Sequence, residues 1–348
     1  MKVTTRLING VPTLAIGIGE QYYSVPSAIA AMKKRSPKLS APVEAFGAPE
    51  TAAENFLRSG YEQALERVET FMQAVLKKEG TEGGVDFQIS AHEAFLPPIP
   101  DMPFYMGIIQ NSPLFWRKFN RRILTNITKG YARSLGATAG HGEVLDLPPG
   151  NGSFRCAIEL GVVVAKDMKN TPENKVMDHV YGYTVVNDMI SNTWKEFADE
   201  MHPLNKPSRF EYLACSYFGR NSDDRAPIGP HIVTKDEVPD PNNLLMFSKF
   251  KGKIKDRAYS NSAIMGIDRV LHLLSQFITI PAGSVVNMGS MGIDGMTFPA
   301  DVKLQPGEVM EMEIEHVGRL QNTFQDRRFD IQKEEGKTNA ALLADLRK

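Results

Sequence analysis

Cysteine is nearly absent from the sequence, since only Cys156 and Cys215 occur among 348 residues. Two cysteines are too few for the disulfide framework of a small secreted domain, and they are typical of a protein from a reducing cytoplasm. Cys156 lies inside an apolar run, so we interpret it as a small buried hydrophobe.

The sequence also lacks a long apolar run and an excess of charge of either sign. No apolar run approaches the roughly 18 residues of a membrane span, and Met1–Arg6 contain no apolar segment of a signal peptide. The 40 basic and 41 acidic residues give a formal charge of −1, which predicts no basic stripe for nucleic acid or an anionic membrane. We therefore expect a cytoplasmic protein that binds neither.

Two apolar, β-branched runs each contain a carboxylate. The first begins at Ala157 and includes Glu159, and the second begins at Val180 and ends at Asp188. A buried carboxylate is costly unless something positive pairs with it. The runs therefore predict two core strands whose carboxylates share a counter-charge, for which a bound cation is the first candidate. The alternative is that each carboxylate caps a strand end or accepts backbone N–H bonds.

These runs and several further motifs resemble the fumarylacetoacetate hydrolase superfamily. The family core has a Glu-x-Glu-Leu-x-Val-Val strand and then Gly-Tyr-x-x-x-Asn-Asp. Leu147–Gly150 precedes the first run, as a Leu-Pro turn does in the family. The motifs that follow the second run in the family's order are Gly219–Asp223, Ala226–Pro230, Pro281–Val286 and Leu304–Ile314. The resemblance implies an α+β, mostly β, fold, in which the catalytic domain is a mixed β-sandwich or roll. It also implies a homodimer.

The chain is expected to contain three parts. Residues 1–100 are predicted to form a small α/β N-terminal domain, residues 101–325 the catalytic domain, and residues 326–348 a charged helical tail.

Local patterns within the N-terminal part predict its elements. Asn9-Gly10 joins two apolar runs and predicts a β-hairpin. Helical spacing follows from Ser27 to Lys34 and from Ala48 to Lys78. The proline-rich stretch Leu96–Pro100 predicts a stiff linker before the catalytic domain.

The family resemblance implies a Mg²⁺ or Mn²⁺ ion held by three carboxylates. Glu159 and Asp188 correspond to two of the ligands, but Ala157 occupies the position of the third. Mg²⁺ needs only one or two carboxylates when water and substrate oxygens complete its shell. We therefore expect a site with weakened affinity for the metal ion. One alternative is a site that binds the ion only together with a chelating substrate, and the other is a complete loss of metal binding.

Arg220 stands where the family has a lysine. An arginine can stabilise a substrate anion but cannot give up a proton, so Arg220 is predicted to be an anion anchor; its alternative role is to pair with Asp223 or Asp224. By the same resemblance, the remaining substrate contacts are expected from Asn187, Tyr183, Asp223 and Gly289, with Ser290 contributing a hydroxyl to catalysis.

The family's lid histidine, which activates water, has no counterpart in residues 105–116. A base with a pKa near neutrality is the usual way to make hydroxide at pH 7. His141 in a turn-rich stretch is the best replacement, with Glu143 to orient it. The alternative is that His141 is an exposed turn residue.

Three functions remain open from the sequence. The leading hypothesis is a hydrolase or lyase that cleaves a C–C bond in a diketo acid, as in aromatic catabolism, through a metal-stabilised enolate. The second is a re-purposed family member that decarboxylates, isomerises, hydrates or cyclises a 2-oxo acid or 1,3-dicarbonyl compound. The third is a metal-free binding protein without catalysis.

Overall fold

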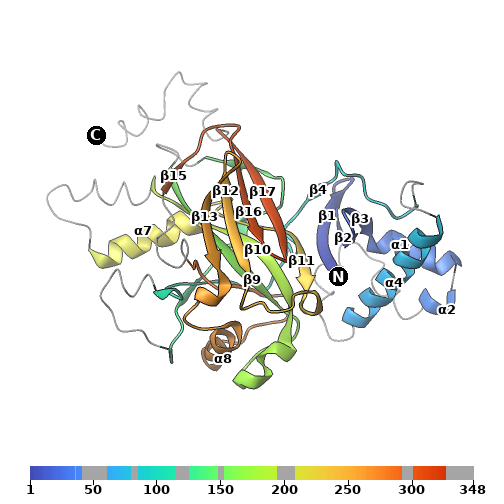
Figure 1. The fold of residues 1–348 in the computed structure, drawn as a ribbon, viewed down its shortest axis with the longest axis horizontal. Coiled ribbons are helices and arrows are strands. Elements are labelled where there is room, and N and C mark those ends of the chain that lie inside the picture. Colours follow the sequence, from blue (N-terminus) through green and yellow to red (C-terminus); the bar gives the residue numbers. More distant parts are fainter. Residues whose placement is uncertain are drawn as a thin grey trace.

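The computed structural model describes residues 1–35, 37–40, 61–79, 85–113, 125–147, 153–193, 208–291 and 301–326. Strands dominate these residues and form two sheets, with helices at the periphery (Figure 1). The predicted α+β, mostly β, fold is therefore confirmed. The predicted helical tail and the lid segment Leu114–Trp116 lie outside the described residues.

The larger sheet is built from strands of both predicted domains. Its strands are β1 (Lys2–Ile8), β2 (Val11–Ile18), β3 (Gln21–Ser24), β4 (Ala94–Phe95), β5 (Tyr105–Ile108), β6 (Gly130–Ala132), β7 (Thr138–Ala139), β9 (Ser153–Val164), β10 (Val180–Ser191), β11 (Ala226–Thr234), β14 (Val285–Asn287) and β15 (Asp301–Lys303). The main path runs β3-β2-β1-β11-β10-β9-β14-β5-β6. Because β1 pairs with β11, the N-terminal hairpin extends the sheet that contains β9 and β10.

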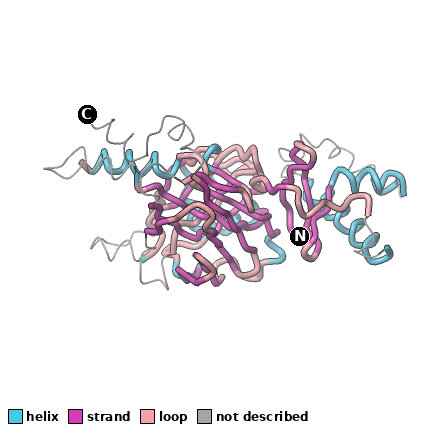
Figure 2. Tube along the Cα trace, turned by 90° about the horizontal axis from the view of Figure 1, so that it is seen from above, coloured by secondary structure: helices cyan, strands magenta, loops and turns pink. Residues whose placement is uncertain are grey.

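A smaller sheet packs against one face of the larger one. Its strands are β8 (Val144–Asp146), β12 (Leu245–Phe250), β13 (Lys253–Tyr259), β16 (Val309–Ile314) and β17 (Gly318–Gln325), in the order β13-β12-β16-β17-β8. Side chains of both sheets form one apolar core between them. In the view from above, strands fill the body of the molecule and helices lie toward its two ends (Figure 2).

The helices lie on both sides of the larger sheet. They are α1 (Val25–Arg35), α2 (Pro37–Ser40), α4 (Tyr61–Glu79), α7 (Arg209–Asn221) and α8 (Ile267–Phe277), with the 3-10 turns η2 (Leu135–Ala137), η3 (Glu173–His179), η4 (Lys235–Glu237) and η5 (Ser260–Ser262). A capping box starts α7, because Ser208 and Glu211 exchange side-chain to backbone hydrogen bonds. Gly219 brings α7 close to β10, since a Cβ there would stand 2.6 Å from the Ser191 carbonyl oxygen.

The N-terminal hairpin has the predicted turn. Asn9 and Gly10 both have positive φ, at 51° and 79°, between β1 and β2. Helix α1 overlaps the helix predicted from Ser27 to Lys34, and α4 covers the second half of the longer helical prediction, whose first half lies outside the described residues. The division at residue 100 stays a prediction.

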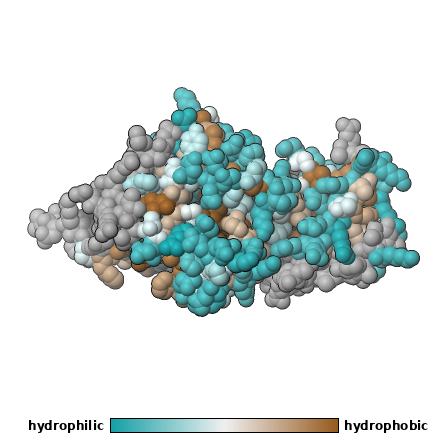
Figure 3. Space-filling model, turned by 60° about the horizontal axis from the view of Figure 1, so that its bottom comes forward, coloured by the Kyte–Doolittle hydropathy of each residue, from teal (hydrophilic) through white to brown (hydrophobic). Residues whose placement is uncertain are grey.

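Among the described residues, no helix is long and apolar enough to cross a bilayer. On the face shown in Figure 3 most side chains are hydrophilic, and the apolar ones occur in small separate patches.

Candidate functional site

The two strands that carry the predicted carboxylates pair side by side in the larger sheet. In the antiparallel register of β9 and β10, Asp188 is opposite Ala157, and Glu159 is opposite Val186. Opposed residues point to the same face of a sheet. Glu159 and Asp188 are therefore diagonal neighbours on one face, and Ala157 lies beside both.

Within the part of the chain that the structure describes, no strand pairs with the middle of β9 along its second edge. In the described residues β9 pairs with β15 at Ser153–Arg155 and with β14 at Gly161–Val163. Ala157 and Glu159 lie between these two partners. The strand pairing is therefore interrupted beside the two carboxylates. Residues of the loop after β14 lie at this interruption, where the Met288 N–H donates a hydrogen bond of 2.9 Å to the Leu160 carbonyl oxygen.

Asp188 is held between two arginines and a tyrosine. The guanidinium groups of Arg133 and Arg220 both form ion pairs with its carboxylate. The Tyr131 hydroxyl lies 3.2 Å from Asp188 Oδ1 and accepts a hydrogen bond of 2.9 Å from Arg220 Nη1. Asp188 is only 6% exposed, so these cations supply the counter-charge that a buried carboxylate requires.

The two arginines differ in exposure and in what else they hold. The Arg133 side chain is fully buried, and its Nη1 donates to the backbone carbonyls of Arg220 at 2.6 Å and Arg225 at 3.2 Å. The Arg220 side chain is 20% exposed at the last turn of α7. Arg133 therefore fastens the end of α7 to the sheet, whereas Arg220 is reachable from solvent.

Glu159 is the second buried carboxylate of the group. Burial raises the pKa of its carboxyl to about 7, although Arg220, Arg133, the Gly289 N–H and the Asn287 amide act in the opposite direction. Among the residues that the structure describes, its Oε2 has no hydrogen-bond partner. The Glu159 carboxylate thus has one oxygen available to a bound group.

Sequence reasoning missed Arg133, Tyr131 and Asn287. Tyr131 and Arg133 are two residues apart at the end of β6, a spacing that puts both side chains on one face. This alternation was a usable signal, but a three-residue strand is too short to stand out from a loop. Asn287, at the end of β14, donates to the Tyr105 hydroxyl at 3.1 Å as well as bonding Glu159.

Two predicted substrate contacts lie on the other face of the sheet. Asn187 and Tyr183 alternate with Asp188 along β10 and point into the core between the sheets. The Asn187 Nδ2 is 3.4 Å from Met310 Sδ of β16, and Tyr183 belongs to the same apolar core. The structure does not bring either side chain to the Asp188 group.

Gly289 and Ser290, two further predicted site residues, lie in the loop after β14. Gly289 has a φ of +86°, and a Cβ there would stand 2.8 Å from the Ile108 carbonyl oxygen. Only glycine fits this close approach without strain, and it allows the Gly289 N–H to donate to Glu159. Ser290 follows directly and is partly exposed.

Asp223 and His141 lie apart from the arginine group. Asp223 follows the C-terminal end of α7, next to Gly136 of η2. His141 packs edge-on against Phe95, with ring centroids 5.1 Å apart, and accepts a 3.1 Å hydrogen bond from the Gln321 N–H. Burial lowers the His141 pKa to about 4. The structure therefore does not assemble His141 with Arg220 and Ser290.

Comparison with known proteins adds to this geometry. Residues 117–325, more than half of the chain, match the family described as "Fumarylacetoacetate (FAA) hydrolase C-terminal". The chain belongs to the fumarylacetoacetate hydrolase family. An uncharacterized protein of Staphylococcus saprophyticus is 25% identical over 271 residues, which are 76% of this chain and 83% of that protein.

Two solved family structures have a similar fold. The maleylpyruvate hydrolase from Sphingobium sp. SYK-6, in complex with manganese(II) and pyruvate, has a TM-score of 0.65 at 16% identity, covering 93% of this chain and 98% of that one. The fumarylacetoacetate hydrolase from Exiguobacterium antarcticum has a TM-score of 0.62 at 16% identity, covering 94% and 100%. Both family members are enzymes, and one of them binds a divalent metal ion.

The residues of this chain fit a divalent metal ion only in part. Glu159 Oε2 has no partner in the described part of the chain, and Glu159 and Asp188 share a face, so two carboxylate oxygens can meet one ion. The described residues contain no group of three or more His, Cys, Asp and Glu side chains arranged to hold a metal. Asp188 also shares its charge with Arg133 and Arg220. The donor set therefore fits a two-carboxylate site completed by water and substrate oxygens.

Proposed function

We propose that this protein is an enzyme of the fumarylacetoacetate hydrolase family that acts on a small anionic oxo acid or 1,3-dicarbonyl compound through an enolate. One observation carries the proposal: buried Glu159 and Asp188 share a sheet face with the two guanidinium groups of Arg133 and Arg220. This arrangement can bind a carboxylate and stabilise the charge of an enolate oxygen in a water-poor site.

Each charged residue has a role that follows from its exposure. Arg220 is partly exposed, so its guanidinium binds the substrate anion. Arg133 is buried and positions Arg220 through the Arg220 carbonyl oxygen. The Tyr131 hydroxyl forms hydrogen bonds with both Asp188 and Arg220 and so holds these two side chains in a fixed relative position.

The metal proposal concerns a weakened Mg²⁺ or Mn²⁺ site. Glu159 and Asp188 would hold the ion, with Ala157 in the place of a third carboxylate. When bound, the ion would polarise a substrate carbonyl oxygen as a Lewis acid. The residues of the chain position the substrate, exclude water from the buried carboxylates and balance their charge.

The leading reaction is cleavage of a C–C bond in a diketo acid. Purified protein with Mg²⁺ or Mn²⁺ is incubated with a set of acylpyruvates, and products are followed by NMR. We expect release of pyruvate, lost on Asp188→Ala and in excess EDTA. Full turnover in EDTA would contradict the metal proposal, and no conversion of any acylpyruvate would contradict the cleavage reaction.

A second candidate is isomerisation or decarboxylation of a 2-oxo or 1,3-dicarbonyl acid. The placement of His141 favours it, because the base proposed for making hydroxide lies against Phe95 and not beside Arg220. Enolate formation alone needs charge stabilisation and proton transfer but no activated water. In D₂O isomerisation predicts exchange of protons next to the carbonyl group with every C–C bond intact, and decarboxylation predicts release of CO₂ with a deuteron taken up at the carbon that carried it. Neither releases pyruvate from an acylpyruvate, so NMR distinguishes both from the first candidate.

We also propose that the protein is a cytoplasmic homodimer without a nucleic-acid or membrane partner. Helix α7 supports the dimer, because Phe210, Leu213 and Phe218 are 80%, 56% and 57% exposed and large apolar side chains on one helix are typical of an interface. Light scattering after size-exclusion chromatography tests this; we expect twice the mass of one chain, and a monomer at micromolar concentration would contradict it.

A further inference from the structure

Helices α1, α2 and α4 line a cavity of about 680 Å³. Helix α1 contacts both of the others, and β1, β2 and β3 separate the three helices from β9 and β10 (Figure 1). Sites for small organic molecules have volumes of about 300–1,000 Å³. The cavity is therefore large enough for such a ligand, and none of the described residues that line it belongs to the Asp188 group.

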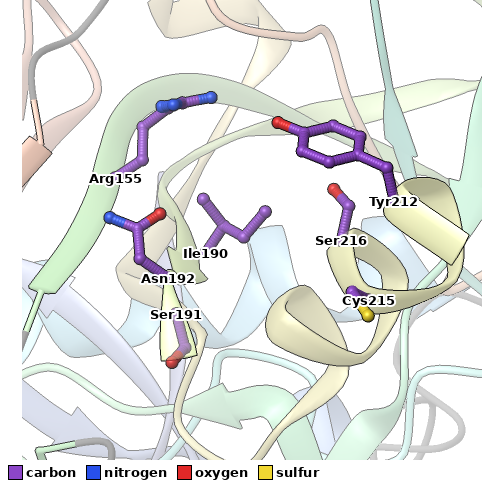
Figure 4. A pocket seen from close by; sticks show the side chains of 7 residues that line it. All are labelled: Arg155, Ile190, Ser191, Asn192, Tyr212, Cys215 and Ser216. Atoms are coloured by element: carbon purple, nitrogen blue, oxygen red, sulfur yellow. The ribbon is translucent and has the colours of Figure 1, made fainter. Parts of the chain in front are cut away.

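A second cavity, between β9, β10 and α7, is far smaller. Figure 4 shows Arg155 and Asn192 on one side of it and Tyr212 and Ser216 on the other, with Ile190 between them. Its volume of about 10 Å³ admits one water-sized group. Of the two cavities, the one between the helices is thus the one that can bind an organic ligand.

The floor of the larger cavity is apolar. Met32 of α1 and Val75 of α4 are buried, and Phe71 of α4 is partly buried against the core of the N-terminal part. Ala74, beside them on α4, is exposed and has too small a side chain to cover this surface. A ligand that removes such an apolar surface from water gains free energy.

Basic side chains outnumber acidic ones around the cavity. The charged residues that line it are Arg35, Lys38, Arg67, Lys78, Glu66 and Glu79. Arg35 Nη1 and Glu79 Oε1 form an ion pair of 2.6 Å, which balances both charges. Within the described parts of the chain, Lys38, Arg67 and Lys78 form no salt bridge. The cavity is thus apolar with a positively charged rim, which suits an anion with an apolar body.

The shape of the cavity follows from α4. Arg67, Phe71, Ala74 and Lys78 follow one another at intervals of three or four residues, so they lie along one face of the helix. From Arg67 to Lys78 the helix rises by about 16 Å. An extended alkyl chain matches this elongated surface better than a compact ring system does.

The anionic end of the ligand belongs at Lys78. The carboxylate of Glu66 lowers the positive charge at the other end of the cavity. At the Lys78 end, the charge of Glu79 is already balanced by Arg35. The partial negative charge at the C-terminus of α4 is offset by Lys77, which is exposed and is not one of the residues that line the cavity. Lys78 can therefore pair with a carboxylate.

We propose that the cavity between α1, α2 and α4 binds a free carboxylic acid with an extended alkyl chain. The alkyl chain lies on Met32, Phe71 and Val75, and the carboxylate pairs with Lys78. This binding site is independent of the proposed function, because the bound acid does not touch the Asp188 group. It gives the N-terminal part of the protein a ligand of its own.

Two ligands with the same alkyl chain test the proposal. Decanoate carries a carboxylate at the end of the chain, and decyl alcohol carries an uncharged hydroxyl group there. Calorimetric titration of the full chain, at ligand concentrations too low for micelles, is expected to give about fivefold tighter binding of decanoate.

Variants at the rim test the position of the carboxylate. Lys78→Met is expected to weaken decanoate binding by about threefold and to leave the affinity for decyl alcohol unchanged. Lys77→Met is the matched control, because it removes the same charge one residue away, outside the cavity. It is expected to change the affinity for decanoate by less than about twofold.

Variants at the floor test the position of the alkyl chain. Ala74→Trp fills the cavity and is expected to weaken both ligands at least about tenfold. Gln73→Trp is its control, because Gln73 is also exposed on α4 but does not line the cavity, and it is expected to change neither affinity. Thermal unfolding of each variant checks that it is folded.

The contrary outcomes are distinct. Equal affinity for the two ligands, or equal effects of Lys78→Met and Lys77→Met, overturns the pairing of a carboxylate with Lys78. Failure of both ligands to bind, or binding that survives Ala74→Trp, overturns the site. Arg220→Met is expected to leave decanoate binding unchanged; if it abolishes binding, the acid occupies the proposed catalytic group instead. Sedimentation with phosphatidylglycerol vesicles that Ala74→Trp abolishes would overturn a free acid as the ligand in favour of a membrane lipid.

Discussion

At the scale of single residues, Asp188 balances the charge of the site. Its carboxylate is the partner of two guanidinium groups, one of them on the fully buried side chain of Arg133. Replacing Asp188 with asparagine preserves its shape and leaves the buried arginine without a counter-ion, which costs about 3 kcal/mol or more. We expect urea unfolding of Asp188→Asn to show this loss of unfolding free energy. We also expect the variant to be inactive in a turnover assay.

The control for Asp188→Asn is an ion pair near the surface. Lys249 and Glu313 pair on the smaller sheet, with the Glu313 side chain 40% exposed. Glu313→Gln is expected to change the free energy of unfolding by less than about 1 kcal/mol. If both substitutions lowered the free energy of unfolding equally, the large contribution that we assign to the buried ion pair would be contradicted.

Ala157 is expected to limit the affinity for metal. It lies opposite Asp188 and two residues from Glu159, so Ala157→Glu adds a third carboxylate on the same face. We expect Mn²⁺ to bind this variant at least tenfold more tightly, measured by electron paramagnetic resonance of free Mn²⁺. Ala157→Gln has the same shape without the charge and serves as the control; equal affinities of the two variants would contradict the metal site.

Residue by residue, the sequence singled out the two buried carboxylates and Arg220, but not Arg133 and Tyr131. Glu159 and Asp188 stand out because charged residues are rare in apolar strands. Arg133 is one of many basic residues, and only the long-range fold brings it to Asp188. Alternation along β10 explains why Asn187 is on the other face: adjacent strand residues cannot share a face.

At the scale of elements, the loop after β14 depends on one glycine. Gly289 has positive φ, and a Cβ would stand 2.8 Å from a backbone oxygen. Gly289→Ala therefore adds a steric clash to backbone strain and displaces the N–H that bonds Glu159. We expect a loss of at least about 2 kcal/mol in unfolding free energy and a strong loss of activity.

Gly252 is the matched control for this substitution. Its φ is +72°, but nothing lies within 4 Å of the position of its Cβ. Gly252→Ala thus isolates the backbone strain, which costs about 1 kcal/mol, and is expected to leave activity unchanged. If Gly289→Ala were no worse than Gly252→Ala, the close approach to Ile108 would have no energetic consequence.

Elements with a strong local signal were predictable and others were not. The Asn9-Gly10 hairpin and the strands around Glu159 and Asp188 follow from turn chemistry and β-branched runs. Helix α7 was missed, although it carries Arg220. Its sequence exposes Phe210, Leu213 and Phe218, so its apolar residues do not form the single buried stripe that identifies an amphipathic helix.

At the scale of the whole molecule, the N-terminal part and the catalytic sheet meet around His231. This residue lies in β11, which pairs with β1 of the N-terminal hairpin. Its Nδ1 is 2.7 Å from the Tyr22 hydroxyl of β3, and its Nε2 is 3.0 Å from the Val317 carbonyl oxygen beside β17. One buried imidazole thus joins the N-terminal hairpin to both sheets.

Protonation of His231 is expected to weaken this junction. Burial, reinforced by the charge of Lys2, lowers the pKa of His231 from 6.5 to about 4. Between these values the unfolded chain binds the proton and the folded chain does not, so stability is retained above pH 6.5 and is lost as the pH falls toward 4. The full loss from this residue is about 3 kcal/mol.

Denaturant unfolding at a series of pH values tests the junction. His141 is expected to act in the same direction, because its pKa is also lowered to about 4, so replacing His231 alone removes only part of the pH dependence. His231→Gln keeps a polar side chain between Tyr22 and Val317 but cannot take up the proton. The fall in unfolding free energy between pH 6.5 and 4 should therefore become shallower by up to about 1.4 kcal/mol per pH unit.

The control is His92→Gln, which replaces an exposed histidine. An unchanged pH dependence in His231→Gln would mean that the N-terminal hairpin and the sheets are joined by contacts that do not depend on this imidazole.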